Sequence, residues 1–147
     1  MYSLAPARLF DLSALKKLED VVFKEDAWPV LDILTILIIP GGINLKAQDD
    51  KSIIGFISVE QNLFEPVAWV STVGVAPEYR RQGVGKSLMM AVEKLVRRPV
   101  ICLCVRKSNE GAIHLYEELG YQKKETRPQY YADGEDAYVM TKKLDKI

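Results

Sequence analysis

The sequence lacks an excess of basic residues, a long apolar run and a recognisable signal sequence. Its 147 residues include twenty basic and twenty acidic side chains, so the formal net charge is zero and no overall positive field is present to hold a nucleic-acid backbone. The strongest apolar run, Val30 to Ile39, is too short to span a bilayer and contains Asp32. The N-terminus shows no charged region followed by an apolar core and a cleavage site. We therefore expect a cytoplasmic protein that works without nucleic acid or a membrane.

Metal-ligating side chains are also scarce. The chain has one histidine, His114, and two cysteines, Cys102 and Cys104, which lie two residues apart in an apolar run. No further cysteine or histidine stands at the spacing of a zinc site, and two such close cysteines do not make a disulfide framework. We therefore expect no metal and two reduced thiols.

Apolar periodicity predicts one domain, residues 1–147, with an α/β architecture around a largely antiparallel sheet. Asp11 and Asn109 are the residues expected to cap the first and last helices, because their side chains accept hydrogen bonds from free helical N–H groups. Strands are expected at 2–7, 43–47, 53–60, 67–75, 100–105, 121–126 and 137–142, and helices at 12–23, 30–38, 84–96 and 110–120.

The most informative segment lies where the strand ending at Val75 leads through a glycine turn into a helix starting near Val84. The first N–H groups of a helix have no intrahelical partner and carry the positive end of its dipole, so they bind an anion that glycine allows to approach. A nucleoside-triphosphate loop would need glycine where Arg80 stands, and the dinucleotide fingerprint fails at Leu88. The segment therefore predicts a pyrophosphate cradle of another kind.

Three segments carry a family resemblance. The pattern Arg80-x-x-Gly83-x-Gly85 resembles the acyl-CoA-binding segment of the GNAT superfamily of N-acetyltransferases, and residues 103–121 resemble its strand, asparagine-capped helix and closing Gly-aromatic pair. Residues 130–140 resemble the C-terminal signature of the protein N-terminal acetyltransferases, including the ribosomal-protein alanine type. The resemblance implies the GNAT fold, in which a mixed, largely antiparallel central sheet has helices on both faces and its central parallel strands splay apart around the coenzyme A arm.

The resemblance implies acetyl-CoA as the cosubstrate and assigns residues to it. The main chain of Val73 and Val75 would pair with the pantetheine amides as an added strand does, and the Val73 N–H would also polarise the thioester carbonyl. Asn109 would contact the pantetheine arm, and Tyr116, two helical turns later, would protonate the departing thiolate. The cradle itself comprises Arg80, Arg81, Gln82, Gly83, Val84, Gly85, Lys86 and Ser87.

Ordinary structural roles compete with some of these assignments. Asn109 would cap its helix in a protein with no ligand, and Tyr116 could be a core tyrosine. His114 is two residues from Tyr116, about 200° around the helix, so we expect it to face solvent.

The acceptor end is less well determined. The resemblance places Phe23, Trp28, Tyr130 and Tyr131 around an acceptor peptide, although Trp28 and one of the two tyrosines could simply be core residues. Two positions that hold a general base in relatives are Trp69 and Cys104 here, and neither is an obvious base at neutral pH. A water molecule, passing its proton toward backbone carbonyls or Glu25, is the alternative.

A weak base favours an α-amine. Deprotonating an α-amine at pH 7 costs about 1 kcal/mol, whereas a lysine costs about 5 kcal/mol. The sequence therefore predicts acetyl transfer, through a ternary complex, to the N-terminus of a protein or peptide, by a monomer or homodimer. The alternatives are a lysine or small-molecule acetyltransferase, an enzyme in which Cys104 carries the acetyl group, and a noncatalytic acyl-CoA-binding module.

Overall fold

Seven strands form one sheet in the computed structural model, which describes residues 1–62 and 64–145. Their order across the sheet is β1-β2-β3-β4-β5-β7-β6. The parallel pair is β4 with β5, and the other neighbours are antiparallel. The strands are β1 (Ser3–Pro6), β2 (Ile43–Gln48), β3 (Ile53–Gln61), β4 (Val67–Val75), β5 (Val100–Arg106), β6 (Gln122–Arg127) and β7 (Ala137–Lys143).

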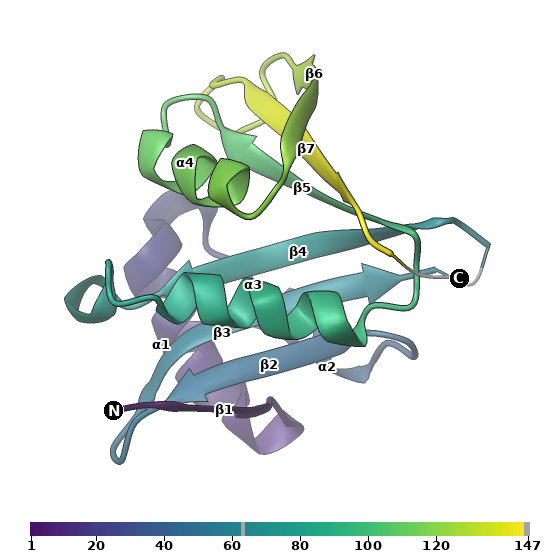
Figure 1. Cartoon of the computed structure of the whole chain (residues 1–147). Coiled ribbons are helices and arrows are strands. Elements are labelled where there is room, and N and C mark those ends of the chain that lie inside the picture. The colour runs from purple at the N-terminus through teal and green to yellow at the C-terminus, as the bar shows by residue number, and fades with distance from the viewer. Residues whose placement is uncertain (63, 146–147) are drawn as a thin grey trace.

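Helices cover both faces of the sheet (Figure 1). The α-helices are α1 (Leu12–Phe23), α2 (Val30–Ile38), α3 (Val84–Leu95) and α4 (Glu110–Glu118). Short 3₁₀ turns lie between some of these elements: η1 (Leu9–Asp11), η2 (Lys24–Asp26) and η3 (Pro77–Tyr79). The predicted fold class is confirmed. Each predicted end of a helix or strand lies within two residues of the observed end.

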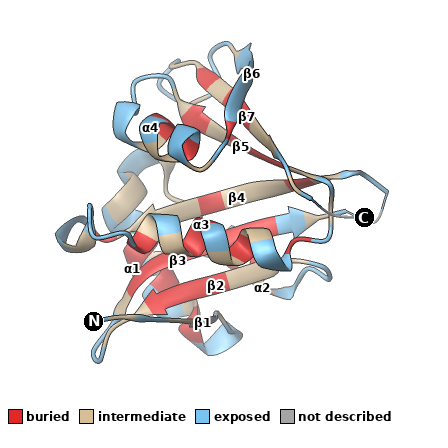
Figure 2. Ribbon diagram, viewed as in Figure 1, coloured by how far each residue is buried: buried red, intermediate tan, exposed pale blue. Residues whose placement is uncertain are grey.

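Each face of the sheet has its own apolar core. The apolar side chains of α3 and α4, such as Leu88, Val92 and Ile113, pack against the sheet on one face. Those of α1 and α2, such as Leu15 and Ile33, pack on the other face. Figure 2 shows the buried stripe of α3 against buried stretches of β2 and β3. The sheet therefore divides the molecule, and a ligand that crosses it needs a break between two strands.

That break lies between β4 and β5. Their parallel pairing covers only Val67↔Val100, Ala68↔Ile101 and Trp69↔Cys102. Both strands then continue, β4 to Val75 and β5 to Arg106, paired only with their outer neighbours. Figure 1 shows the two strands diverging from this short contact, as the predicted splayed pair requires.

The expectation that Asp11 caps α1 is wrong. No side-chain hydrogen bond caps this helix, because the Asp11 carboxylate is buried and used elsewhere. It accepts the Arg8 N–H at 2.8 Å and forms an ion pair with Lys46 at 3.0 Å. Asp11 therefore anchors the entry to α1 onto β2 instead of satisfying the helix end.

Within the described part of the chain, no helix combines the length and the apolar character that crossing a bilayer requires.

Candidate active site

A groove of about 1330 Å³ follows the split between β4 and β5. Its walls come from both strands, from the cradle before α3, from α4 and from the segment around residues 127–131. The Ala76 N–H donates to the Ile54 carbonyl at 2.8 Å, which fixes how β4 faces β3. Because backbone groups alternate along a strand, Val73 and Val75 direct their N–H and C=O groups away from β3, into the split. The two N–H groups and the Val73 carbonyl are therefore available to a ligand that lies along the groove as an extra strand, whereas the Val75 carbonyl accepts a hydrogen bond from Arg80.

The cradle exposes free helical N–H groups to this groove. The first intrahelical bond of α3 runs from the Ser87 N–H to the Gly83 carbonyl at 2.9 Å, so the N–H groups of Val84, Gly85 and Lys86 come before it. Gly83 has φ +83° and Arg81 has φ +61°, left-handed conformations that turn successive amides toward one side. A concavity of such amides binds anions.

The glycines leave space where a diphosphate would approach. A Cβ added at Gly83 would meet nothing within 4 Å. At Gly85 it would lie 3.6 Å from Leu115 Cδ2 and 3.7 Å from Val75 Cγ2, within the groove between α4 and β4. The residues present therefore fit a coenzyme A molecule with its phosphates at α3 and its arm along β4.

Six of the eight predicted cradle residues line the groove: Arg80, Arg81, Gly83, Val84, Gly85 and Lys86. The other two are directed elsewhere. The Gln82 amide donates to the Glu78 carbonyl at 3.2 Å, and the Ser87 hydroxyl bonds the Tyr2 hydroxyl at 2.8 Å. The Arg80 guanidinium donates to the Val75 carbonyl at 3.3 Å, so it sits where the arm would leave the phosphates.

Sequence reasoning missed the support of the cradle. Tyr79 immediately precedes Arg80, and its hydroxyl donates a hydrogen bond to the Asp49 carboxylate at 2.5 Å. This bond, with the Lys51 and Ser52 N–H groups, lowers the pKa of Asp49 to about 2. The turn between β2 and β3 is therefore tied to the segment that enters the cradle. A polar turn in the sequence gave no sign of this partner, which lies thirty residues away.

Asn109 and Tyr116 both reach the groove. The Asn109 side chain accepts the Ala112 N–H at 3.2 Å, so it caps α4, and its amide N–H₂ group remains available to a ligand. His114 pairs with Glu118 at 2.9 Å, one turn further along α4. Both residues also line the groove, but the His114 side chain is 75% exposed, so the expectation that it faces solvent is confirmed.

Tyr116 has the surroundings of a protonated donor. Its residue is 7% exposed, and burial raises the pKa of its phenol to about 12. Its ring packs on that of Tyr121, 6.0 Å between centroids, and within residues 1–62 and 64–145 its hydroxyl has no hydrogen-bond partner. A phenol that stays protonated and faces a groove can donate a hydrogen bond to whatever lies there.

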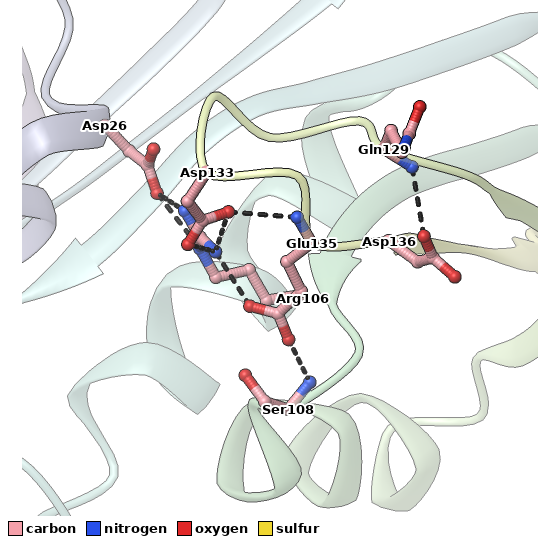
Figure 3. A network of polar contacts seen from close by, with 7 residues as sticks. All are labelled: Asp26, Arg106, Ser108, Gln129, Asp133, Glu135 and Asp136. Atoms are coloured by element: carbon pink, nitrogen blue, oxygen red, sulfur yellow. Dashed lines mark hydrogen bonds and ion pairs between the residues drawn. The ribbon is translucent and has the colours of Figure 1, made fainter.

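At the other end of the groove, Arg106 joins two loops that are distant in sequence. Figure 3 shows its guanidinium between Asp26 of η2 and the acidic residues of the β6–β7 loop. It donates to Asp26 through Nε at 3.0 Å and through Nη2, and its Nη1 reaches Asp133 at 2.9 Å and Glu135 at 2.7 Å. The Asp26 bond is the main reason that the pKa of Arg106 is raised. The loop after α1 and the β6–β7 loop are thus held together across the end of β5.

The predicted acceptor residues meet near this junction. Phe23, Trp28, Trp69, Cys104, Tyr130 and Tyr131 all line the groove. Tyr130 and Tyr131 are packed edge to face, with 5.0 Å between ring centroids, and the Arg106 guanidinium lies 4.2 Å from the Tyr131 ring centroid. Burial raises the pKa of the Cys104 thiol, so this side chain is a neutral thiol at pH 7.

Glu25 is the exception. It is exposed and does not line the groove, whereas its neighbour Asp26 does. The carboxylates that line the groove are Asp26, Glu60 and Glu118, and the first of these is held by Arg106.

Glu19 is a second residue that sequence reasoning missed. It is 3% exposed and accepts the Trp28 N–H at 3.1 Å and the Thr72 hydroxyl at 3.0 Å. Burial is the largest influence on this carboxyl and raises its pKa. The contacts fasten the segment around Trp28 to β4, where it forms one wall of the groove.

Comparisons with known proteins agree with this geometry. The model of the acetyltransferase (GNAT) family matches residues 12–121. An N-alpha-acetyltransferase of Saccharolobus solfataricus is 31% identical, over 97% of this chain and 93% of the relative, and N-alpha-acetyltransferase RimI of Mycobacterium tuberculosis is 30% identical, over 79% and 75%. The crystal structure of the ribosomal-protein-S18-alanine N-acetyltransferase from Escherichia coli superposes with a TM-score of 0.89 and 27% identity, covering 100% of this chain and 96% of that one. The chain belongs to the acetyltransferase (GNAT) family.

Proposed function

We propose that this protein is an acetyl-CoA-dependent N-acetyltransferase that acts on the N-terminal α-amine of a protein or peptide. The observation that carries the proposal is one continuous groove with an anion cradle at one end and an aromatic site at the other. The proposal is supported by the relatives named N-alpha-acetyltransferase, which align over most of this chain, and by the alanine N-acetyltransferase of similar structure.

Different residues of the groove would bind the diphosphate and the pantetheine arm of acetyl-CoA. The N–H groups of Val84, Gly85 and Lys86 would hold the diphosphate, with added charge from Arg80 and Arg81. The main chain of Val73 and Val75 would bond the pantetheine amides, with Asn109 facing them from α4. The Val73 N–H would also stabilise negative charge on the thioester oxygen, which is how a fixed backbone donor speeds acyl transfer.

Tyr116 would serve the leaving group. Its phenol, held protonated by burial, donates a hydrogen bond to the sulfur as negative charge develops there. A pKa of about 12 is well above the pKa of about 8.5 of an ordinary thiol. The phenol therefore works first as a hydrogen-bond donor, and the proton it passes on is replaced by the one released from the amine.

The acceptor end favours an amine that loses its proton easily. Cys104 is a neutral thiol, Asp26 is neutralised by Arg106, and Glu25 lies outside the groove. Water is therefore the proposed proton acceptor. An α-amine costs about 1 kcal/mol to deprotonate at pH 7 and a lysine about 5 kcal/mol, so a site with a weak base discriminates in favour of N-termini.

Four expectations stay predictions. They are that residues 1–147 form one domain, that the protein is a monomer or homodimer, that it works in the cytoplasm, and that it uses neither nucleic acid nor a membrane.

Two measurements test the proposed function. Calorimetry should give a 1:1 complex with acetyl-CoA that is lost when Gly83 and Gly85 are both replaced by valine. A panel of short peptides with free and with blocked N-termini, together with polyamines, amino acids and aminoglycosides, should show acetyl transfer only where a peptide α-amine is free. Transfer to lysine side chains of the blocked peptides, or to the small amines, would contradict the proposed acceptor. Coenzyme binding without transfer would favour a noncatalytic module.

A further inference from the structure

We propose that Arg127 selects acceptors that carry a carboxylate side chain, aspartate or glutamate, among their first residues. The inference rests on the proposed function and names the substrate class of that same site. It starts from the two arginines that line the acceptor end of the groove, Arg106 and Arg127, and from how differently the structure uses their charge.

The charge of Arg106 is already used. Its Nε and both terminal nitrogens donate to Asp26, Asp133 and Glu135 (Figure 3). Three carboxylates around one guanidinium leave it no attraction for a further anion. Arg106 is therefore a structural tie between two loops, and an acidic substrate would find no partner there.

Arg127, unlike Arg106, is not surrounded by carboxylates. In the described part of the chain, its one carboxylate within ion-pair distance is Glu125, 3.6 Å from Nε and on the same strand, and the two side chains are 41% and 55% exposed. Ion pairs of this exposed kind contribute little. Its Nη1 has only the weakly accepting Cys104 sulfur at 4.0 Å. The two terminal nitrogens, which form the fork that binds a carboxylate bidentately, are thus open.

Aromatic rings hold this guanidinium in the groove. Its central carbon lies 5.3 Å from the Trp69 ring centroid and 6.0 Å from that of Tyr130. Cation–π contacts of this kind position a guanidinium without consuming its N–H donors. Arg127 is also the one half-buried residue of β6, whose other residues are exposed. The strand therefore delivers a single cation to the wall formed by Trp69, Cys104 and Tyr130.

Glu60 is a negative charge in the same region and would oppose the binding of an acidic substrate. It lines the groove and pairs with Trp69 across β3 and β4, but it is exposed and is not within ion-pair distance of Arg127. A solvated carboxylate is screened and repels an acidic substrate only weakly, whereas the Arg127 guanidinium, which lies near two aromatic rings, is partly desolvated. The sign of the local preference is therefore set by Arg127.

The test is an acceptor scan with matched peptides. Peptides of one sequence receive a single Asp at each of positions 1 to 4, with Asn and Lys at the same position as controls. We expect wild-type kcat/KM to be about fivefold to tenfold higher for Asp than for Asn at one or more positions. The expected ratio is smaller than a fully buried charged hydrogen bond would give, because the Arg127 side chain is 41% exposed and water weakens the interaction.

Variants assign the preference to Arg127. Arg127→Gln should bring the Asp/Asn ratio to about one, and Arg127→Glu should reverse it so that Lys is preferred over Asn. Lys123→Gln is the matched control: it lies on the same strand, its ammonium sits over the Tyr138 ring at 4.4 Å, and it does not line the groove, so the ratio should not change.

The outcomes separate the two proposals. A wild-type ratio of one or below at every position, or a ratio above one that survives Arg127→Gln, overturns the role of Arg127 while peptide acetylation itself stands. Absence of transfer to every peptide overturns both proposals. If Arg127→Glu is too unstable to assay, the Arg127→Gln ratio and the affinity of the Asp and Asn peptides for the wild-type complex with coenzyme A still decide the matter.

Discussion

Replacing Tyr116, a buried tyrosine of the groove, by Phe separates the contribution of its hydroxyl to chemistry from the contribution of its ring to packing. The substitution keeps the ring that packs on Tyr121 and on the α3 core and removes only the hydroxyl. Because that hydroxyl has no partner among the described residues, its loss leaves no donor or acceptor unsatisfied. The free energy of unfolding at pH 7 should therefore change by less than about 0.5 kcal/mol, as for a substitution that creates no cavity and breaks no bond.

The effect on turnover should be far larger. Removing a positioned proton donor costs about 10²-fold to 10⁴-fold in rate, so kcat should fall by at least two decades while KM for acetyl-CoA changes little. Stability also acquires a pH signature. The folded pKa of about 12 exceeds the ordinary value of 10.0, so the stability contributed by the neutral phenol is complete below pH 10 and is lost as pH rises toward 12. The variant should lack that alkaline loss.

Steady-state kinetics and chemical denaturation of the same preparations check this prediction. Tyr121→Phe is the matched control, because its hydroxyl donates to Glu93 at 2.9 Å and its ring lies outside the groove lining. It should lose about 1 to 2 kcal/mol of stability and keep its kcat. A Tyr116→Phe enzyme with undiminished kcat, or with a stability loss as large as that of Tyr121→Phe, would refute the reasoning and leave Tyr116 a core residue.

Three further predictions address other parts of the site. Gly83→Ala places a side chain at φ +83° and should cost about 1 kcal/mol of stability and weaken acetyl-CoA binding in calorimetry; an unchanged Kd would argue against the cradle. Arg106→Gln releases the loop after α1 from the β6–β7 loop, so KM for the acceptor peptide should rise several-fold while KM for acetyl-CoA stays the same, and an equal rise in both would contradict a role confined to the acceptor end. Glu19→Gln removes a carboxylate whose pKa burial raises above 4.5; the stabilising protonated state is present below that value and is lost as pH rises through the folded pKa. Thermal melts should therefore show the variant at least as stable as the wild type at pH 7, with the difference shrinking toward pH 4, and a wild-type advantage that grows toward neutral pH would contradict this.

The sequence predicted correctly those features that depend on residues close together in the chain. The glycine turn before Val84 predicts both the helix start and the cradle, because a helix N-terminus and its free N–H groups are set by neighbouring residues. Asn109 is an equally local case, since its side chain caps the helix that it begins. The resemblance to the GNAT superfamily added the splayed pair of central parallel strands, which periodicity alone leaves open.

Polar partners distant in sequence were not foreseeable in the same way. Asp11 has the residue type of an N-cap, yet Lys46, thirty-five residues away, takes its carboxylate. Glu25 and Asp26 look alike in the sequence, and only the position of Arg106 makes the second of them a groove residue. Glu19 sits on an amphipathic helix like any surface glutamate until Thr72 and the Trp28 N–H are brought to it.

Periodicity, glycine placement and capping act within a few residues, so the helices, the strands and the helix start at the cradle could be predicted from the sequence. The side chains expected at the groove came from the family resemblance. Which charged side chains are paired and which are left without a close partner of opposite charge depends on the folded arrangement of the strands and loops. Arg106 and Arg127 are the same residue type at the ends of two strands, but folding surrounds the first with three carboxylates and places the second near the rings of Trp69 and Tyr130. Electrostatic pairing depends on distances of a few ångströms between segments far apart in the chain, and those distances exist only once the sheet has formed.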